Sequence, residues 1–470
     1  MATITANKAA PVTDPATLKT PAGPKGAPVL GSIRAMRKDP LRFLLSVSRR
    51  YGDVTQYHFL RLTQYMVNHP AGVKRVLQEN NRNYTKSVFD YQILKSALGQ
   101  GLLTNDDDSW LSQRRLMQPA FHRQRLAAFG TLMTEATTRM LDERWGRFAA
   151  SGRELDVSAE MHELALRIVG NALFGLDLTT EADSVGRALT IAQRRLIDQF
   201  FMPYIPMWVP TPKHLEFRRA IRDIDEVVFK IIEERRRNDE DRGDLLSMLM
   251  LARDADTGEG MDDQQLRDEV ITLLLAGHET TANALTWAWY LLSQNPLAAR
   301  RMREELREVL GGRVPTMSDL PNLTYTRMVL DETMRLYPPA WSISRKATEE
   351  DELAGYRIPA GAFITVSPYA MHRHPRYWEN PEGFDPERFT PERSAQRPPY
   401  AYFPFGGGPR LCIGNNFALM EGQLILATMA QRYRLDLVPG HPVVVEPLIT
   451  LRARYGMRMQ LHPLGDGKVA

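Results

Sequence analysis

Long stretches of the chain place apolar residues every three or four positions, the spacing that lines one face of an α-helix. The longest stretch covers 262–295, where Asp262 or Asp263 can cap the start and Pro296 ends the helix. Its middle, 270–276, is nearly all apolar and is expected to run through the core. Further helices are predicted over 126–149, 160–173, 183–199, 213–237 and 416–432.

Alternating patterns typical of strands are short by comparison. We predict strands over 54–67 and 354–366, the second as a hairpin through Gly355 and 359–361. His372 and His374 also alternate as on a strand, and we expect them to serve structure rather than a metal site. The patterns together predict a mainly α-helical protein with a smaller β-rich part.

An apolar segment over 200–210 separates two of the predicted helices. Four prolines within 203–212 forbid a continuous helix there. Two interpretations remain open: a loop folded onto the core, and an exposed lid over an apolar cavity.

The composition limits the classes of function. The chain has 470 residues, 43% hydrophobic and 25% charged, which is typical of a globular enzyme large enough to enclose a cofactor. Its 60 Lys and Arg against 56 Asp and Glu give a net charge of +4, too weak to indicate nucleic acid as a partner. The start of the chain lacks the apolar run of a signal peptide or membrane anchor. We therefore expect a flexible lead over 1–20, a single domain over 21–470, and a soluble, cytoplasmic, monomeric protein.

The only cysteine, Cys412, lies in a glycine-rich segment, 405–414, just before a predicted helix. A single cysteine excludes a disulfide within the chain and any site that needs several cysteines. A lone cysteine is usually an inert buried residue. Here, however, glycines allow the backbone to wrap around the sulfur, and a helix N-terminus favours the thiolate. These features indicate a metal-bound thiolate. A phosphate-binding loop is the alternative, but no Gly-Lys-Ser/Thr sequence follows the glycines.

The glycine-rich segment resembles the haem-binding loop of the cytochrome P-450 superfamily, F-x-x-G-x-R-x-C-x-G. Other short motifs of the superfamily occur in the expected order, and although each is weak alone, together they are specific. The matching positions are Phe405, Gly408, Arg410, Cys412 and Gly414 in the loop, Trp110 and Arg114 in W-x-x-x-R, 276–281 in the oxygen-binding part of the central helix, Glu332 and Arg335 in E-x-x-R, and 386–389 in P-E-R-F.

The resemblance implies the cytochrome P-450 fold, with haem b between the long central helix and the Cys loop. Cys412 is then the iron ligand. The guanidinium groups of arginines can form two parallel hydrogen bonds with a carboxylate, so they are expected to bind the two haem propionates. The implied haem-binding residues are Trp110, Arg114, Arg345, Phe405, Arg410, Cys412 and Gly414.

The resemblance also implies two groups of charged or polar residues. Glu332, Arg335 and Arg388 are expected to form a structural charge network, since an incompletely paired buried charge is costly. Glu279 and Thr280 are expected to deliver protons toward bound dioxygen, acting as a general acid through a hydroxyl and water. The intact acid–alcohol pair favours dioxygen over peroxide as the oxidant.

The implied reaction inserts one oxygen atom of O2 into a substrate, with two electrons ultimately from NAD(P)H. We expect a separate ferredoxin or flavodoxin-type donor and its reductase to supply them. Arg115, Arg123 and Arg125 could attract an acidic partner. The alternative, to which we give equal weight, is that these arginines are ordinary surface charges without a partner protein.

The substrate is expected to be a lipophilic small molecule: a fatty acid, terpenoid, steroid or macrolide. A haem-thiolate protein that isomerises, dehydrates or only binds its ligand is the second class of function. The candidate pocket residues are apolar and several are aromatic: Phe89, Tyr91, Leu94, Leu103, Leu275, Ala276, Ala340, Trp341, Ile343 and Leu451.

Overall fold

The computed structural model describes residues 18–175, 182–201, 205–206, 208–238, 242–254 and 258–465. The chain forms two compact units, each built from three segments. The first comprises Met1–Val88, Ser342–Pro381 and Arg397–Cys412, and the second comprises Phe89–Trp341, Glu382–Gln396 and Ile413–Ala470. The predicted lead over 1–20 lies almost entirely outside the described residues.

The first unit is β-rich. Its five-stranded sheet has the order β1-β2-β8-β5-β3, in which only the β2–β8 pair is parallel. A separate hairpin pairs β6 with β7. The strands are β1 Val54–Phe59, β2 Leu62–Val67, β3 Tyr84–Thr85, β5 Ile343–Ala347, β6 Asp351–Leu353, β7 Tyr356–Ile358 and β8 Phe363–Val366, and the helical segments are α1 Ile33–Lys38, α2 Pro40–Tyr51, α3 Pro70–Lys74, η2 Arg75–Glu79, η3 Asn81–Asn83, α15 Pro368–Met371 and η8 Gly408–Arg410.

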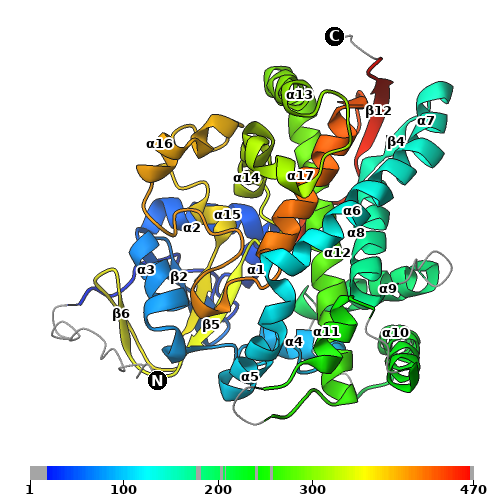
Figure 1. Ribbon diagram of the computed structural model, residues 1–470. Coiled ribbons are helices and arrows are strands. Elements are labelled where there is room, and N and C mark those ends of the chain that lie inside the picture. The colour runs from blue at the N-terminus through cyan, green and yellow to red at the C-terminus, as the bar shows by residue number, and fades with distance from the viewer. Residues whose placement is uncertain are drawn as a thin grey trace, which may run out of the picture. The chain divides into compact units, whose positions relative to one another are not determined.

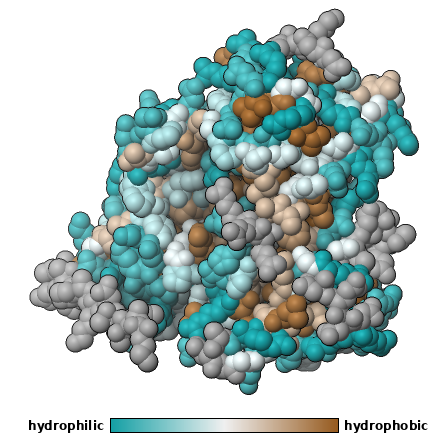
Figure 2. Space-filling model, in the orientation of Figure 1, coloured by the Kyte–Doolittle hydropathy of each residue, from teal (hydrophilic) through white to brown (hydrophobic). Residues whose placement is uncertain are grey.

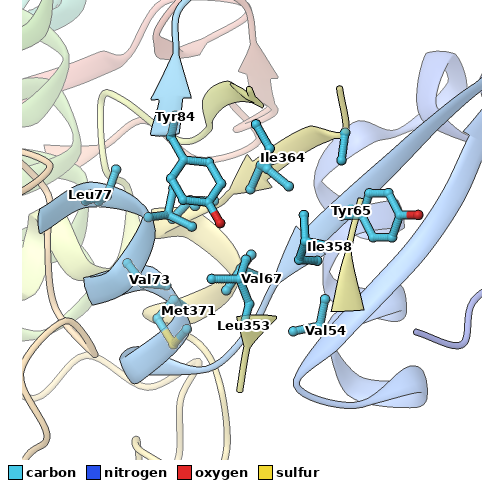
Figure 3. Packing of buried hydrophobic residues seen from close by; sticks show 14 of the residues in the cluster. Val54, Tyr65, Val67, Val73, Leu77, Tyr84, Leu353, Ile358, Ile364 and Met371 are labelled. Carbon is cyan, nitrogen blue, oxygen red and sulfur yellow. The ribbon is translucent and has the colours of Figure 1, made fainter. Parts of the chain in front are cut away.

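The core of the first unit lies where the sheet, the hairpin and the α3–η2 segment meet. Figure 3 shows Val67 of β2 gathered with Leu353 of the hairpin and Val73 of α3. These three side chains are fully buried, as is Ile364 of β8. The burial of such branched apolar side chains stabilises the unit.

The second unit is mainly helical. Its helical segments are α4 Phe89–Leu98, α5 Asp107–Met117, η4 Gln118–Phe121, α6 Arg123–Met140, η5 Leu141–Trp145, α7 Gly146–Ser151, α8 Val157–Phe174, α9 Ala182–Phe201, α10 Pro212–Asn238, α11 Leu245–Leu251, α12 Asp263–Gln294, α13 Pro296–Leu310, η6 Met317–Asn322, α14 Thr324–Leu336, η7 Pro386–Phe389, α16 Pro391–Ala395 and α17 Asn415–Ala430. Small sheets pair β4 Leu155–Asp156, β12 Arg458–Pro463 and β9 Tyr433–Leu437, and β10 Val445–Pro447 with β11 Leu451–Ala453.

The central helix of this unit is α12, which runs beside α8 and also packs against α14 and α17 (Figure 1). The Asp262 carboxylate caps its first turn by accepting a hydrogen bond from the Gln265 N–H at 2.7 Å. Pro296 starts the next helix, so α12 ends at Gln294. The predicted bounds are therefore confirmed to within one residue at each end.

Hydrophilic residues dominate the face of the molecule in Figure 2, with apolar residues in small groups among them. Such a distribution is ordinary for a surface in contact with water. Within the described part of the chain, none of the helices combines the length and the apolar character needed to cross a bilayer.

Two strand predictions need correction. The turn at Gly355 is confirmed, with φ +82°, but after 359–361 the chain leaves the hairpin and β8 joins the five-stranded sheet. His372 and His374 do not lie on a strand, because Ser367 caps a short helix, α15, which ends just before them. The His372 Nε2 instead accepts a hydrogen bond from the Phe403 N–H at 2.9 Å.

Two helical predictions also differ from the structure. The predicted helix over 126–149 is broken by a π-helical turn, η5, between α6 and α7. Helix α9 continues to Phe201, into the predicted loop. Of the rest of that loop, Ile205 and Trp208 are 46% and 78% exposed, while 202–204 and 207 lie outside the described residues.

Candidate active site

The glycine-rich segment before Cys412 folds into a tight turn within the first unit. Gly406 and Gly408 have φ of +74° and +63°, the left-handed region that favours glycine. A β-carbon at Gly408 would lie 2.0 Å from the carbonyl oxygen of Leu77, so no other residue fits there. The Cys412 N–H donates to the Phe405 carbonyl at 3.0 Å, and Cys412 is exposed at the end of the turn.

Two of the predicted haem-binding arginines belong to the same unit as Cys412. Arg345, on β5, is only 6% exposed, and its Nη1 donates to the Ser344 carbonyl at 2.8 Å. Arg410 is half-buried, two residues before Cys412. An exposed thiol on a narrow backbone turn, with guanidinium groups in the same unit, is a donor set that fits haem and its propionates.

Trp110 and Arg114 lie one helical turn apart on α5 in the second unit, so they share a face. Trp110 is buried and Arg114 is half-buried. Arg115 is exposed on the same helix, whereas the side chains of Arg123 and Arg125 are outside the described residues. Gly414 precedes the first residue of α17.

One face of α12 carries small residues. Ala276 is exposed and Thr280 is half-buried, whereas Leu275, His278 and Glu279 are buried. Ala276 and Thr280 are four residues apart and therefore on one side of the helix, where a flat group could approach closely. The Thr280 hydroxyl donates to the Ala276 carbonyl at 2.7 Å.

The Glu279 carboxyl, next to Thr280 on the same helix, contacts α9. It is 5% exposed, and its Oε2 accepts a hydrogen bond from Gln193 Nε2 of α9 at 2.8 Å. Burial raises the pKa of Glu279, and a hydrogen bond with the Thr450 side chain and the charge of Arg452 act in the opposite direction.

Glu332, Arg335 and Arg388 are brought together by the structure. Arg335 forms a two-pronged pair with Glu332, with Nε–Oε2 at 2.6 Å and Nη2–Oε1 at 2.8 Å. Arg388 Nε lies 3.3 Å from the same Oε1, which also accepts from the Asp385 N–H at 2.8 Å. Glu332 and Arg335 are fully buried, so the pair depends on this complete set of partners.

The candidate pocket residues differ in burial and are not all in one unit. Ile343 belongs to the first unit, and the other nine belong to the second. In the second unit, the Leu451 N–H donates to the Pro339 carbonyl at 3.1 Å, which places β11 beside the segment that leads to Ala340 and Trp341. Leu94, Leu275 and Leu451 are buried, Tyr91, Trp341 and Ile343 are half-buried, and Phe89, Leu103, Ala276 and Ala340 are exposed.

The sequence analysis missed a second buried carboxyl, that of Glu421 on α17. It is 1% exposed, and its Oε2 accepts a hydrogen bond from the Thr281 hydroxyl of α12 at 3.0 Å. Among the described residues, its Oε1 has no hydrogen-bond partner. Burial raises the pKa of Glu421 to about 8. An acidic residue in the middle of an apolar helical stretch, 417–430, was the signal that could have revealed it.

Comparison with known proteins decides the family. The model of the Cytochrome P-450 family matches residues 21–451. The chain belongs to the cytochrome P-450 family. It is therefore a haem-thiolate oxidoreductase, a monooxygenase that uses haem and O2.

Several curated relatives of this cytochrome P-450 come from Streptomyces. Two come from Streptomyces melanosporofaciens: cyclooctatin synthase, 39% identical over 92% of this chain and 93% of its own length, and cyclooctat-9-en-7-ol 5-monooxygenase, 38% identical over 93% of each. Pentalenene oxygenase of Streptomyces avermitilis is 35% identical over 95% of this chain and 98% of its own length.

A solved structure has the same fold. The crystal structure of the cytochrome P450DA heme domain superposes with a TM-score of 0.87 at 27% identity, covering 96% of this chain and 99% of that one. The predicted fold class is confirmed.

Proposed function

We propose that this cytochrome P-450 hydroxylates a lipophilic terpenoid. The net reaction is R–H + O2 + two electrons + two protons giving R–OH + water. The observation that carries the proposal is the similarity, over more than nine-tenths of this chain, to relatives whose names specify oxidation of cyclooctat-9-en-7-ol and pentalenene.

The chain's own residues supply the haem site. Cys412 would ligate the iron through its thiolate, within the turn formed by Phe405 and the glycines. Arg345 and Arg410 would bind propionates, and the family's W-x-x-x-R motif assigns the same role to Trp110 and Arg114. Gly414 would let the backbone turn into α17. A thiolate-ligated haem supplies the activation of dioxygen and the insertion of an oxygen atom.

Thr280 and Glu279 would deliver protons to the reaction site. The Thr280 hydroxyl now donates to the Ala276 carbonyl, and it can instead hold a water beside the exposed face of α12. Glu279, the neighbouring carboxyl, would supply protons to that water. This is general acid catalysis by a positioned donor.

Apolar side chains would select the substrate. Leu94, Leu275 and Leu451 present only carbon to a ligand, so a hydrocarbon skeleton would bind by burying its surface. Trp341 is held by a hydrogen bond from its Nε1 to the Leu448 carbonyl at 2.8 Å, which would leave its ring for contact with the ligand.

Electrons would come ultimately from NAD(P)H through a ferredoxin or flavodoxin-type protein and its reductase. The exposed Arg115 offers a positive charge to an acidic donor protein. A drop in the rate of reduction for Arg115→Glu, with substrate binding unchanged, is the expected result.

Two experiments test the proposed function. Reduced, CO-bound protein should show the red-shifted absorption of thiolate haem, and Cys412→Ser should lose it. Purified protein with a surrogate ferredoxin and reductase should then convert cyclic terpene hydrocarbons into alcohols that contain one atom from labelled O2.

Fatty acids of similar size serve as the competing substrate class in the same assay. Oxidation of the fatty acids alone would overturn the terpenoid assignment but leave the monooxygenase activity. A product that contains no labelled oxygen would instead favour the isomerising or ligand-binding alternative.

A further inference from the structure

Three residues far apart in the sequence converge on the carboxyl of Glu279. Gln193 comes from α9, Thr450 from the turn between β10 and β11, and Arg452 from β11. Gln193 and Thr450 are themselves buried, at 7% and 6% exposure. Water therefore reaches none of these hydrogen bonds readily, so each depends on its geometry.

The Thr450 hydroxyl is oriented by a fourth residue. Asn283, one turn after Glu279 on α12, donates from its Nδ2 to Thr450 Oγ1 at 3.0 Å. A hydroxyl that accepts one hydrogen bond keeps its own hydrogen for another acceptor. That hydrogen is available to the Glu279 carboxyl, and the hydrogen bond with the Thr450 side chain lowers the pKa of Glu279.

Glu279 is thus surrounded by groups that donate or carry positive charge. Gln193 contributes an amide N–H, Thr450 a hydroxyl, and Arg452 a guanidinium that is also bonded to Glu446 from Nε to Oε2 at 3.1 Å. All three favour the ionised carboxylate, while burial favours the neutral acid. Burial and these neighbouring groups therefore act on the pKa of Glu279 in opposite directions.

We propose that Gln193 and Thr450 are positioning residues: they hold the Glu279 carboxyl in one orientation and set the ease with which it gives up its proton. The inference rests on the role of Glu279 given under the proposed function. Neither side chain needs to touch the substrate or the haem for this purpose.

The test uses the haem-loaded protein in its resting state, without substrate. The carboxylic C=O infrared band of Glu279, assigned as the difference between wild type and Glu279→Gln, is titrated with pH. Gln193→Leu and Thr450→Val each remove one donor and keep the side-chain volume nearly unchanged. Each should shift the midpoint upward by about one pH unit, because a hydrogen bond to the ionised form is lost.

Matched variants separate positioning from general disturbance of the fold. Thr450→Ser keeps the hydroxyl and should restore the wild-type midpoint. Thr286→Val removes a buried hydroxyl from the same helix, one that donates to the Ala282 carbonyl at 2.7 Å and not to Glu279, and should leave the midpoint unchanged. The charged groups near Glu279 are Arg452 and, bonded to it, Glu446; the titratable groups are the adjacent His278 and His162, whose ring centroids lie 6.3 Å apart.

Turnover provides the second readout. In Gln193→Leu and Thr450→Val, product formed per NADPH oxidised should fall several-fold and its pH optimum should move upward with the infrared midpoint. Unchanged midpoints in both variants, or an equal shift in Thr286→Val, would overturn the proposal. The infrared titration needs no substrate, so it decides this question even if no terpenoid is oxidised.

Discussion

Two buried carboxyls in the second unit, Glu332 and Glu421, have very different surroundings. Glu332 accepts four N–H hydrogen bonds, three from arginines and one from the backbone of Asp385. Glu421 accepts one, from the Thr281 hydroxyl. Both are at most 1% exposed. Burial is therefore the same, and the two sites differ in the number of hydrogen-bond donors around the carboxyl.

The largest loss of stability is expected when Glu332, the carboxyl with four donors, is removed. Glu332→Ala leaves Arg335 and Arg388 buried without their anion, which costs about 3–5 kcal/mol. We expect little folded, haem-loaded protein, measured by haem content and urea unfolding. The control is Glu387→Ala, in the same segment as Arg388, because Glu387 is half-exposed and pairs with Arg301 at the surface. Equal stability of the two variants would contradict a structural role for the cluster.

Glu279 lies between these extremes, and the next prediction concerns its partner in proton delivery. Thr280→Ala removes the hydroxyl and leaves the apolar pocket intact. NADPH and O2 should be consumed at nearly the wild-type rate, while product per NADPH falls by up to about 100-fold and hydrogen peroxide is released. Thr280→Ser keeps the hydroxyl and should remain coupled. Full coupling in the alanine variant would restrict Thr280 to helix packing.

Glu421, the carboxyl with a single donor, should make the free energy of unfolding depend on pH. The pKa of Glu421 is about 8 in the folded protein against 4.5 for an ordinary glutamate, so the folded state binds this proton more tightly. Its contribution to stability is complete below pH 4.5 and is lost as the pH rises toward 8. Between pH 6 and 7 the free energy of unfolding should fall by about 1.4 kcal/mol per pH unit relative to Glu421→Gln, and the slope should flatten as the pH passes 8. Parallel pH profiles for the two proteins would show that Glu421 is ionised throughout.

The smallest effect concerns the single donor to Glu421. Thr281→Val removes the hydroxyl that favours the ionised carboxylate, so the pKa of Glu421 should rise further. The variant should lose about 1 kcal/mol more stability at pH 9 than at pH 6. The measurement is urea unfolding at the two pH values, with Glu421→Gln/Thr281→Val as the reference that removes both partners. An equal loss at both pH values would mean that the threonine acts by packing alone.

Local signals in the sequence were sufficient to predict the bounds of α12 and the turn before Cys412. Asp262 and Pro296 mark the ends of α12 because capping and the proline ring act on immediate neighbours. The glycines before Cys412 were recognised for the same reason, since each φ is a property of one residue. The resemblance to the cytochrome P-450 superfamily, which the family comparison confirms, rests on several such short motifs.

Contacts between residues that are far apart in the chain could not be predicted from the sequence. Gln193 and Thr450 lie far from Glu279 in the chain, and nothing in their neighbours distinguishes them from other polar residues. The π-helical turn Leu141–Trp145 changes the helical register without a proline or glycine inside it. His372 was assigned to a strand because His-Arg-His alternates, yet Ser367 and Pro368 start a helix just before it.

The backbone contact at Gly408 has a practical consequence for directed evolution. Every amino acid that a mutation could introduce there brings a carbon atom to within 2.0 Å of the Leu77 carbonyl oxygen. Random mutagenesis of that codon would fill a library with inactive clones. Diversity is better directed to Ala340 and Leu103, where exposed side chains leave room for new shapes.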